Sequence, residues 1–309
     1  MQTTIVKAPA KVNLYLDVIN RRSDGYHNIE TIFERIDLYD WIKISIIPTG
    51  IRLMCGQGLP SGINNTAYKA VKLLTERYNL KCGFKIQIDK RIPIAAGLGG
   101  GSSDAAAVLL GVHNLLNIKG EKQALLKIAA RIGADVPFFV SGYSRAFATG
   151  IGDKLLPLKQ TQRMYFLLVA PDIRISASSV YRRLDNLKNR DYFSGLWFPR
   201  NGKKLKPFVN LALTKKRRNV NIIRYNLRHS VVNNINDILY NRLEEAILPS
   251  YPVLHSIKKA LKKTGAEGIL VSGSGSAVYG VFSGRKEAIK AESELMERRN
   301  WRLFLARNC

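Results

Sequence analysis

Alternating apolar and polar residues mark the first part of the chain as strand-forming. β-Branched and aromatic side chains recur near every second position over residues 6–19, 31–47 and 84–92. This period is typical of β-strands, whose successive side chains point to opposite faces. Residues 21–27 form a polar turn around Asp24-Gly25, a dipeptide that favours tight turns. The first two strands are therefore expected to be joined by a short turn.

Helical spacing of apolar residues dominates much of the remaining chain. Ala67, Ala70, Val71 and Leu74, for example, recur every three or four residues. Helices are predicted over residues 65–79, 102–116, 122–132, 231–247, 253–264 and 287–298, and further strands over 164–170, 269–271, 277–282 and 301–306. Because strands and helices come in mixed runs, the pattern favours an α+β fold over a doubly wound parallel sheet.

Chain length leaves room for two modest domains. The 309 residues are enough to bury a substantial core. We place a boundary just before the strand expected at residues 164–170, which gives domains at 1–160 and 161–309. The second of these contains a basic insertion near residues 186–230.

Composition narrows the class of protein. Hydrophobic residues make up 46% of the chain and charged residues 23%, which is typical of a globular protein. No apolar run approaches the roughly 18–20 residues of a membrane span, and Lys7 and Lys11 interrupt any signal-peptide core. We expect a soluble, cytoplasmic protein with no membrane partner.

Cysteine and histidine patterns predict no disulfide framework and no metal centre held by the protein alone. The three cysteines, Cys55, Cys82 and Cys309, are far apart and form no CxxC pair. The four histidines form no HExxH motif.

Positive charge is the unusual feature of the composition. The net charge is +26, and residues 182–229 hold fourteen Lys and Arg against two Asp, a net charge of +12. Aromatic residues such as Trp197 and Phe208 lie among these charges, a combination that can bind nucleic acid. A solvated surface loop is the alternative that we favour, so a nucleic-acid partner is not expected.

A glycine-rich loop at residues 93–103 carries the clearest chemistry. It reads PIAAGLGGGSS and precedes a predicted helix. Glycines let the backbone approach a ligand closely, and the N–H groups and dipole of a helix N-terminus favour an anion there. Ser102, Ser103 or Asp104 could cap that helix. The loop lacks the Gly-Lys-Ser/Thr of a Walker A motif and the last glycine of GxGxxG. A plain connecting turn is the alternative to a phosphate site.

Three ordered motifs resemble those of the GHMP kinases, the superfamily of galactokinase, homoserine kinase and mevalonate kinase. The glycine loop is similar to their signature motif. APAKVNL at residues 8–14 looks like their first motif, and GILVSGSGS at residues 268–276 looks like their third. The resemblance implies a two-domain kinase, with an N-terminal ATP-binding domain like domain 2 of ribosomal protein S5 and a C-terminal α/β sandwich domain. It also implies ATP and Mg²⁺ as cofactors.

Further strings are similar to one branch of the superfamily. RSDGYH at residues 22–27, GADVPFF at 133–139 and ATGIGD at 148–153 resemble the kinases that act on 4-diphosphocytidyl-2-C-methyl-D-erythritol. The activity implied is transfer of phosphate from ATP to the 2-hydroxyl of this cytidine-diphosphate-linked methylerythritol, in the non-mevalonate route to isoprenoid precursors. The small-molecule substrate is thus the expected partner.

The resemblance implies roles for individual residues. Lys11 and Asp135 are the expected catalytic pair: Asp135 orients the attacking hydroxyl and Lys11 offsets charge on the moving phosphoryl group. Residues expected to surround the nucleotide are Pro93, Ala96, Gly97, Leu98, Gly99, Gly100, Gly101, Ser102 and Ser103, with Ser103 also a contact for Mg²⁺. Residues expected to hold the acceptor substrate are Asn13, Tyr26, His27, Tyr181, Gly273 and Ser274.

Tyr26 and Tyr181 are expected to enclose the cytosine from opposite sides, while His27 hydrogen-bonds the base edge. Without the resemblance, Lys11 could be a solvated strand lysine, Asp135 a helix cap and His27 a surface histidine.

Two other functions remain open from the sequence. One is a GHMP kinase of the homoserine or mevalonate type, which the Tyr26-His27 pair disfavours. The other is an RNA-binding protein, since the superfamily shares its fold with a ribosomal protein domain and the chain is basic. An RNA-binding protein would not need Lys11, Asp135 and two glycine-rich loops together.

Overall fold

The computed structural model describes residues 2–56, 58–119, 122–160, 162–194, 238–297 and 300–309, with side chains omitted over residues 188–194. Most of the predicted basic insertion at residues 186–230, including the run Lys215–Arg218, lies outside the described residues. No helix among the described residues is both long enough and apolar enough to cross a membrane.

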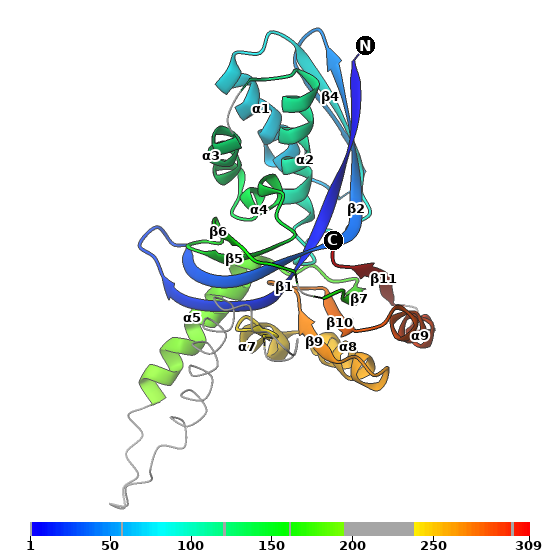
Figure 1. Ribbon diagram of the computed structural model, residues 1–309. Coiled ribbons are helices and arrows are strands. Elements are labelled where there is room, and N and C mark those ends of the chain that lie inside the picture. Colours follow the sequence, from blue (N-terminus) through cyan, green and yellow to red (C-terminus); the bar gives the residue numbers. More distant parts are fainter. Residues whose placement is uncertain (1, 57, 120–121, 161, 195–237, 298–299) are drawn as a thin grey trace, which may run out of the picture.

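A seven-stranded sheet forms the upper layer of the molecule (Figure 1). Its strands are β1 (Thr3–Arg21), β2 (His27–Ile47), β3 (Ile51–Cys55), β4 (Gly83–Asp89), β5 (Arg145–Thr149), β6 (Lys154–Pro157) and β8 (Tyr240–Asn241). The order is β3-β4-β2-β1-β8, and β5 pairs with β2 and β6. The helices α1 (Thr66–Tyr78), α2 (Gly100–Leu115), α3 (Lys122–Ile132) and α4 (Val136–Ser141) cover one face of this sheet.

A second, antiparallel sheet lies below the first in Figure 1. Its order is β11 (Trp301–Arg307), β7 (Tyr165–Pro171), β10 (Val278–Phe282) and β9 (Gly268–Val271). This sheet packs against four helices: α5 (Ala177–Ser194), α7 (Glu244–Ile247), α8 (Pro252–Lys263) and α9 (Arg285–Leu295). The chain passes from one sheet to the other between β6 and β7, but β8 returns to the first sheet. The proposed boundary at residue 160 stays a prediction.

Burial on both faces explains why β7 and β10 of the second sheet are continuously apolar. In β7, Phe166 and Leu168 enter a core shared with β1 and β2, whereas Leu167 and Val169 enter a core formed with α5, α7, α8 and α9. β10 divides its side chains in the same way. The two sheets are therefore joined by apolar packing and not by the connecting chain alone.

Most predicted elements occur within a few residues of their expected ends, and the α+β prediction is confirmed. The helix predicted over residues 231–247 is wrong where it can be compared: residues 240–241 form β8, and only Glu244–Ile247 is helical. Residues 231–237 lie outside the described part of the chain. The elements β3, β5, β6, α4 and α5 were not predicted from the sequence.

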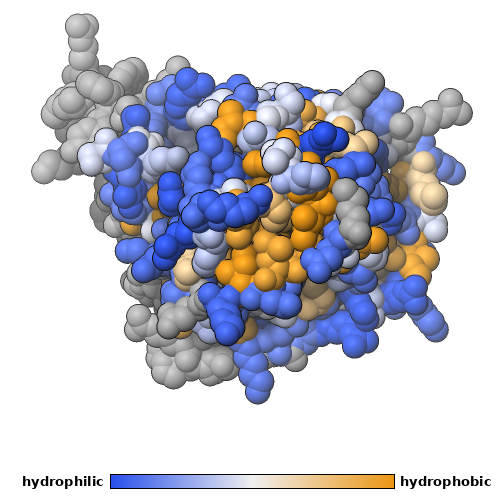
Figure 2. Space-filling view, turned by 90° about the horizontal axis from the view of Figure 1, so that it is seen from above, coloured by the Kyte–Doolittle hydropathy of each residue, from blue (hydrophilic) through white to orange (hydrophobic). Residues whose placement is uncertain are grey.

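The upper end of the molecule in Figure 1 has both apolar and hydrophilic surface. Viewed from above, an apolar area lies among hydrophilic residues (Figure 2). Because apolar atoms contribute more than half of a typical protein surface, such an area does not by itself identify a binding site.

Candidate active site

Lys11 provides a buried positive charge where the two sheets meet. Its side chain is 5% exposed. Nζ donates a hydrogen bond to Oδ1 of Asn13 at 2.6 Å and lies 3.5 Å from Oδ2 of Asp135. It also lies 5.2 Å from the centre of the Phe33 ring. A buried ammonium group requires such partners, so the alternative of a solvated strand lysine is excluded.

Asp135 stands at the start of α4 but does not cap it. Its side chain makes no hydrogen bond to the first turn of the helix, although capping was the structural alternative for this residue. The carboxylate is 29% exposed and faces Lys11. The structure therefore brings together the two residues predicted as a catalytic pair and leaves the carboxylate accessible to a ligand.

The glycine-rich loop follows β4 and leads into α2. Gly97 and Gly99 have φ of 75° and 70°, the left-handed region that glycine tolerates best. Gly99 is the residue before the helix, and no side chain caps α2. The expected cap from Ser102, Ser103 or Asp104 is therefore wrong, because the helix starts two residues earlier than predicted. The glycines Gly100 and Gly101 form its first turn.

Two cavities meet at this loop. The larger, of about 790 Å³, is bordered by Lys11, Asn13, Asp135, the Tyr26-His27 turn and Tyr181. The smaller, of about 320 Å³, is bordered by the glycine loop and the start of α1. Gly97, Gly99 and Ser102 border both cavities. Two ligands, one in each cavity, could therefore contact one another beside Lys11 and Asp135.

The predicted nucleotide residues line the smaller cavity, with one exception. Those that line it are Pro93, Ala96, Gly97, Leu98, Gly99, Gly100, Gly101 and Ser102. Ser103 borders neither cavity, is fully buried, and its hydroxyl has no hydrogen-bond partner among the described residues. Its first-turn position places Ser103 on the packed side of α2, so its predicted contact with Mg²⁺ is not supported by this geometry.

The third motif packs its backbone against the glycine loop. Oγ of Ser272 donates a hydrogen bond to the Gly97 carbonyl at 3.0 Å, and the Ala277 N–H donates to the Ala96 carbonyl at 3.1 Å. Gly273 and Ser274, which are expected to hold the acceptor substrate, border the larger cavity. The two glycine-rich segments thus form adjacent walls of one site.

Asn241, which was not predicted as a site residue, holds the third motif in place. Its Nδ2 donates hydrogen bonds to the carbonyls of Val271 and Gly273, both at 2.8 Å. Its Oδ1 accepts a bond from the Leu243 N–H. Nothing in the surrounding sequence distinguishes this asparagine, because its role depends on contacts with a strand about 30 residues away.

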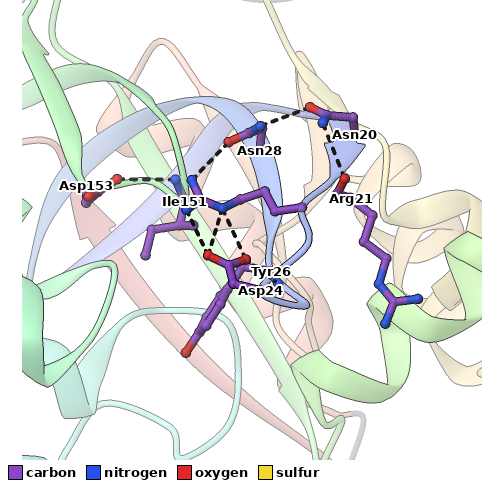
Figure 3. A network of polar contacts seen from close by, with 8 residues as sticks. Asn20, Arg21, Asp24, Tyr26, Asn28, Ile151 and Asp153 are labelled. Atoms are coloured by element: carbon purple, nitrogen blue, oxygen red, sulfur yellow. Dashed lines mark hydrogen bonds and ion pairs between the residues drawn. The ribbon is translucent and has the colours of Figure 1, made fainter.

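The turn between β1 and β2 is held by polar contacts that present Tyr26 to the cavity. Asp24 accepts a hydrogen bond from the Tyr26 N–H at 3.1 Å and bonds from Nε and Nη2 of Arg22 at 2.8–3.1 Å. Arg22 also reaches Oδ1 of Asn28 at 3.4 Å. Figure 3 shows the Tyr26 ring projecting away from this network. Tyr26 as a residue is 59% exposed, so its side chain is accessible to a ligand.

Tyr181 contacts His27 from α5. The two rings are stacked, with centroids 4.8 Å apart and an angle of 24° between planes. Burial, with a smaller effect of the Asp135 charge, raises the pKa of Tyr181 well above its usual value. Tyr26 and Tyr181 both border the larger cavity, but the face of Tyr181 is turned to His27 in this structure. That the two tyrosines enclose a base stays a prediction.

A buried cluster of charges lies directly behind the glycine loop. Nζ of Lys90 is 2.6 Å from carboxylate oxygens of both Asp40 and Asp104. Asp40 also accepts hydrogen bonds from the N–H groups of Arg91 and Ile92. Burial, opposed by Lys90 and reinforced by Asp40, raises the pKa of Asp104 to about 7. The cluster links β2, the start of the loop and α2.

Replacing Asp104 with asparagine should weaken the pH dependence of stability. The raised pKa means that the folded protein holds a proton over about pH 4–7, where the unfolded chain has released it. The contribution of Asp104 to the free energy of unfolding is therefore greatest below that range and is lost as the pH rises to about 7. Urea unfolding from pH 5 to pH 8 should show a smaller fall in stability for Asp104→Asn than for the parent. Parallel curves for the two proteins would contradict the raised pKa.

Two side chains with oxygen donors lie along the larger cavity. Among the described residues, no cluster of three His, Cys, Asp or Glu side chains could hold a metal ion by itself. The Ser102 hydroxyl and the Asp135 carboxylate both border the larger cavity. Oxygen donors of this kind suit Mg²⁺, which usually keeps substrate phosphates and water among its ligands.

Comparison with known proteins agrees with this geometry. Residues 65–143 match the family model "GHMP kinases N terminal domain", and residues 223–300 match "GHMP kinases C terminal". The chain is 39% identical over 303 residues to 4-diphosphocytidyl-2-C-methyl-D-erythritol kinase from Geobacter sulfurreducens, covering 97% of both chains. It is 38% identical over 299 residues to the kinase of the same name from Syntrophotalea carbinolica, covering 96% of both.

Solved structures show the same relationship. A crystal structure of 4-(cytidine 5'-diphospho)-2C-methyl-D-erythritol kinase has a TM-score of 0.73 and 32% identity, with 98% of both chains covered. The mevalonate kinase of Methanococcus jannaschii has a TM-score of 0.71 at 16% identity, covering 99% of this chain and 98% of that one. The latter similarity shows a shared fold alone.

Proposed function

This chain belongs to the GHMP kinases and, within them, to the 4-diphosphocytidyl-2-C-methyl-D-erythritol kinase family; on that premise we propose that it transfers the γ-phosphoryl group of ATP to the 2-hydroxyl of 4-diphosphocytidyl-2-C-methyl-D-erythritol. The reaction would belong to the non-mevalonate route to isoprenoid precursors. The observation that carries the proposal is the Lys11–Asp135 pair, 3.5 Å apart, beside the junction of the two cavities.

The cavities suit the two substrates in their lining. The smaller one offers backbone N–H groups and the N-terminus of α2 to the triphosphate of ATP. The larger one is lined by polar side chains, among them Asn13 and Asp135, and by the rings of Tyr26 and Tyr181, which suits a substrate that joins a sugar alcohol to a base. The acceptor hydroxyl would lie near Asp135.

The roles of the two central residues follow from their charges. Asp135 would accept a hydrogen bond from the acceptor hydroxyl, orient it and take its proton as the bond to phosphorus forms. Lys11, held by Asn13, would offset negative charge on the transferred group. The Ser102 hydroxyl would help to hold Mg²⁺, which would supply further charge neutralisation. Action in the cytoplasm stays a prediction from the sequence.

An ADP-release assay across a panel of hydroxyl substrates tests the proposal. Activity is expected with the cytidine-linked methylerythritol and Mg²⁺-ATP, and not with free methylerythritol phosphate, homoserine or mevalonate. Equal turnover of homoserine or mevalonate would keep the chain among the GHMP kinases and refute the proposed substrate.

Replacing Tyr26 with alanine should raise the KM for the cytidine-linked substrate. Stacking of a base on an aromatic ring contributes about 1–3 kcal/mol, which corresponds to roughly 5- to 150-fold. The loss should appear in KM, because the base binds equally in the ground and transition states. The KM for ATP should not change, since Tyr26 does not border the smaller cavity. Tyr26→Phe keeps the ring and should restore the parent KM; an unchanged KM in Tyr26→Ala would exclude stacking.

A further inference from the structure

The side chain of His27 contacts two residues of one helix, α5. His27 is the first residue of β2, its side chain is 7% exposed, and its Nε2 lies 2.9 Å from Oδ1 of Asp185 on α5. Tyr181, one helical turn before Asp185, stacks on the imidazole ring. Residues four apart on a helix share a face, so α5 contacts both the plane and the edge of His27.

The contact with Asp185 determines where the imidazole carries its proton. An ionised carboxylate can only accept hydrogen bonds, so Nε2 must be the donor of this pair. In the neutral imidazole, Nδ1 is then an acceptor. Among the residues that the structure describes, none pairs with Nδ1, and the imidazole borders the larger cavity. Stacking by Tyr181 opposes rotation of the ring that would exchange the two nitrogens.

We propose that Asp185 is a positioning residue that keeps His27 in the Nε2–H tautomer, so that Nδ1 selects a base with an exocyclic amino group. This inference rests on the proposed function, in which the larger cavity holds a cytosine. The amino group at C4 of cytosine would donate to Nδ1. Uracil carries a carbonyl at that position, which would face Nδ1 as a second acceptor and leave both groups without a bond.

Arg21 provides the comparison that separates this role from simple anchoring. Its Nε lies 3.8 Å from the other carboxylate oxygen of Asp185, and its side chain is 62% exposed. If Asp185 served mainly to attach Arg21 to α5, removing Arg21 would reproduce the effect of removing Asp185. If Asp185 acts through His27, the two substitutions have different effects on base selection.

The first test measures selectivity. The ratio of kcat/KM for the cytidine-linked substrate to that for its uridine-linked analogue should fall about tenfold or more in Asp185→Ala. Asp185→Glu, which can still accept from Nε2, should recover part of the ratio. Arg21→Ala should leave the ratio unchanged, whatever it does to the activity on each substrate. An unchanged ratio in Asp185→Ala would overturn the inference, provided that the parent phosphorylates the cytidine-linked substrate. Failure of the parent to do so would instead refute the proposed function.

The second test needs no substrate. Long-range ¹H–¹⁵N correlation spectra distinguish the two neutral imidazole tautomers, and His27→Gln identifies the His27 signals. The parent should show the proton on Nε2, and Asp185→Ala should shift the population towards the Nδ1–H form. A parent spectrum with the proton on Nδ1, or identical tautomer populations in both proteins, would overturn the assignment to Asp185. A variant that fails to fold is recognised by its lost signal dispersion, and Asp185→Glu then provides the comparison.

Discussion

Asp135→Asn should lower kcat by roughly 10²- to 10⁴-fold, the usual effect of losing a positioned acid–base group. Asparagine has nearly the shape of aspartate but cannot accept the proton of the acceptor hydroxyl. The fold should persist, because Lys11 keeps its 2.6 Å hydrogen bond to Asn13 and because Asp135 makes no cap bond to α4. The affinity for ATP should remain near that of the parent, since Asp135 does not border the smaller cavity.

Steady-state kinetics together with nucleotide binding would check this expectation. Asp172→Asn is a suitable control because Asp172 is exposed and borders neither cavity. If Asp135→Asn retained more than half of the parent kcat, Asp135 would have a structural role. The proposed function of the Lys11–Asp135 pair would then have to be abandoned.

Gly97→Ala should reduce kcat/KM at least about 100-fold and lower the thermal unfolding midpoint. A Cβ on Gly97 would lie 1.9 Å from the carbonyl oxygen of Ser272 and 3.1 Å from the N of Gly275, and φ is 75°. These neighbours are backbone atoms of the third motif, so the clash can be relieved only by separating the two glycine-rich segments. A displacement of about 1 Å in a catalytic arrangement can cost 100-fold.

Gly133→Ala is the matched control for this substitution. Its Cβ would meet only Val136 at 3.6 Å and Ser102 at 4.0 Å, which are ordinary contacts. Both variants can be compared by thermal unfolding and by ADP release. Parent-like stability and activity in Gly97→Ala would show that the third motif does not pack on the glycine loop as the structure has it.

Features encoded by neighbouring residues could be predicted from the sequence. Residues 65–79 carry an apolar stripe at helical spacing, and α1 occupies Thr66–Tyr78. The glycine-rich loop is recognisable because its conformational freedom and the anion preference of a helix N-terminus are local properties. Lys11 and the Tyr26-His27 turn could be identified as parts of a site only through short motifs that resemble those of the GHMP kinases.

Short strands and isolated polar residues could not be predicted in this way. β5 and β6 contain only five and four residues, and their strand conformation depends on pairing with β2 and with each other. Strand formation of this kind is determined by neighbours in space more than by intrinsic preference. Residues 238–247, expected to be helical, likewise include β8, which pairs with β1.

The sequence alone determined the family motifs, the α+β class and the chemical types of the residues at the site. Only the tertiary structure decided which of them meet: Asp135 beside Lys11, Asp185 beside His27, and Lys90 between two buried aspartates. It also turned Ser103 away from both cavities. The physical reason is that periodicity and backbone freedom act over a few neighbouring residues, whereas a charged side chain acquires its partner and its burial only when distant segments pack together.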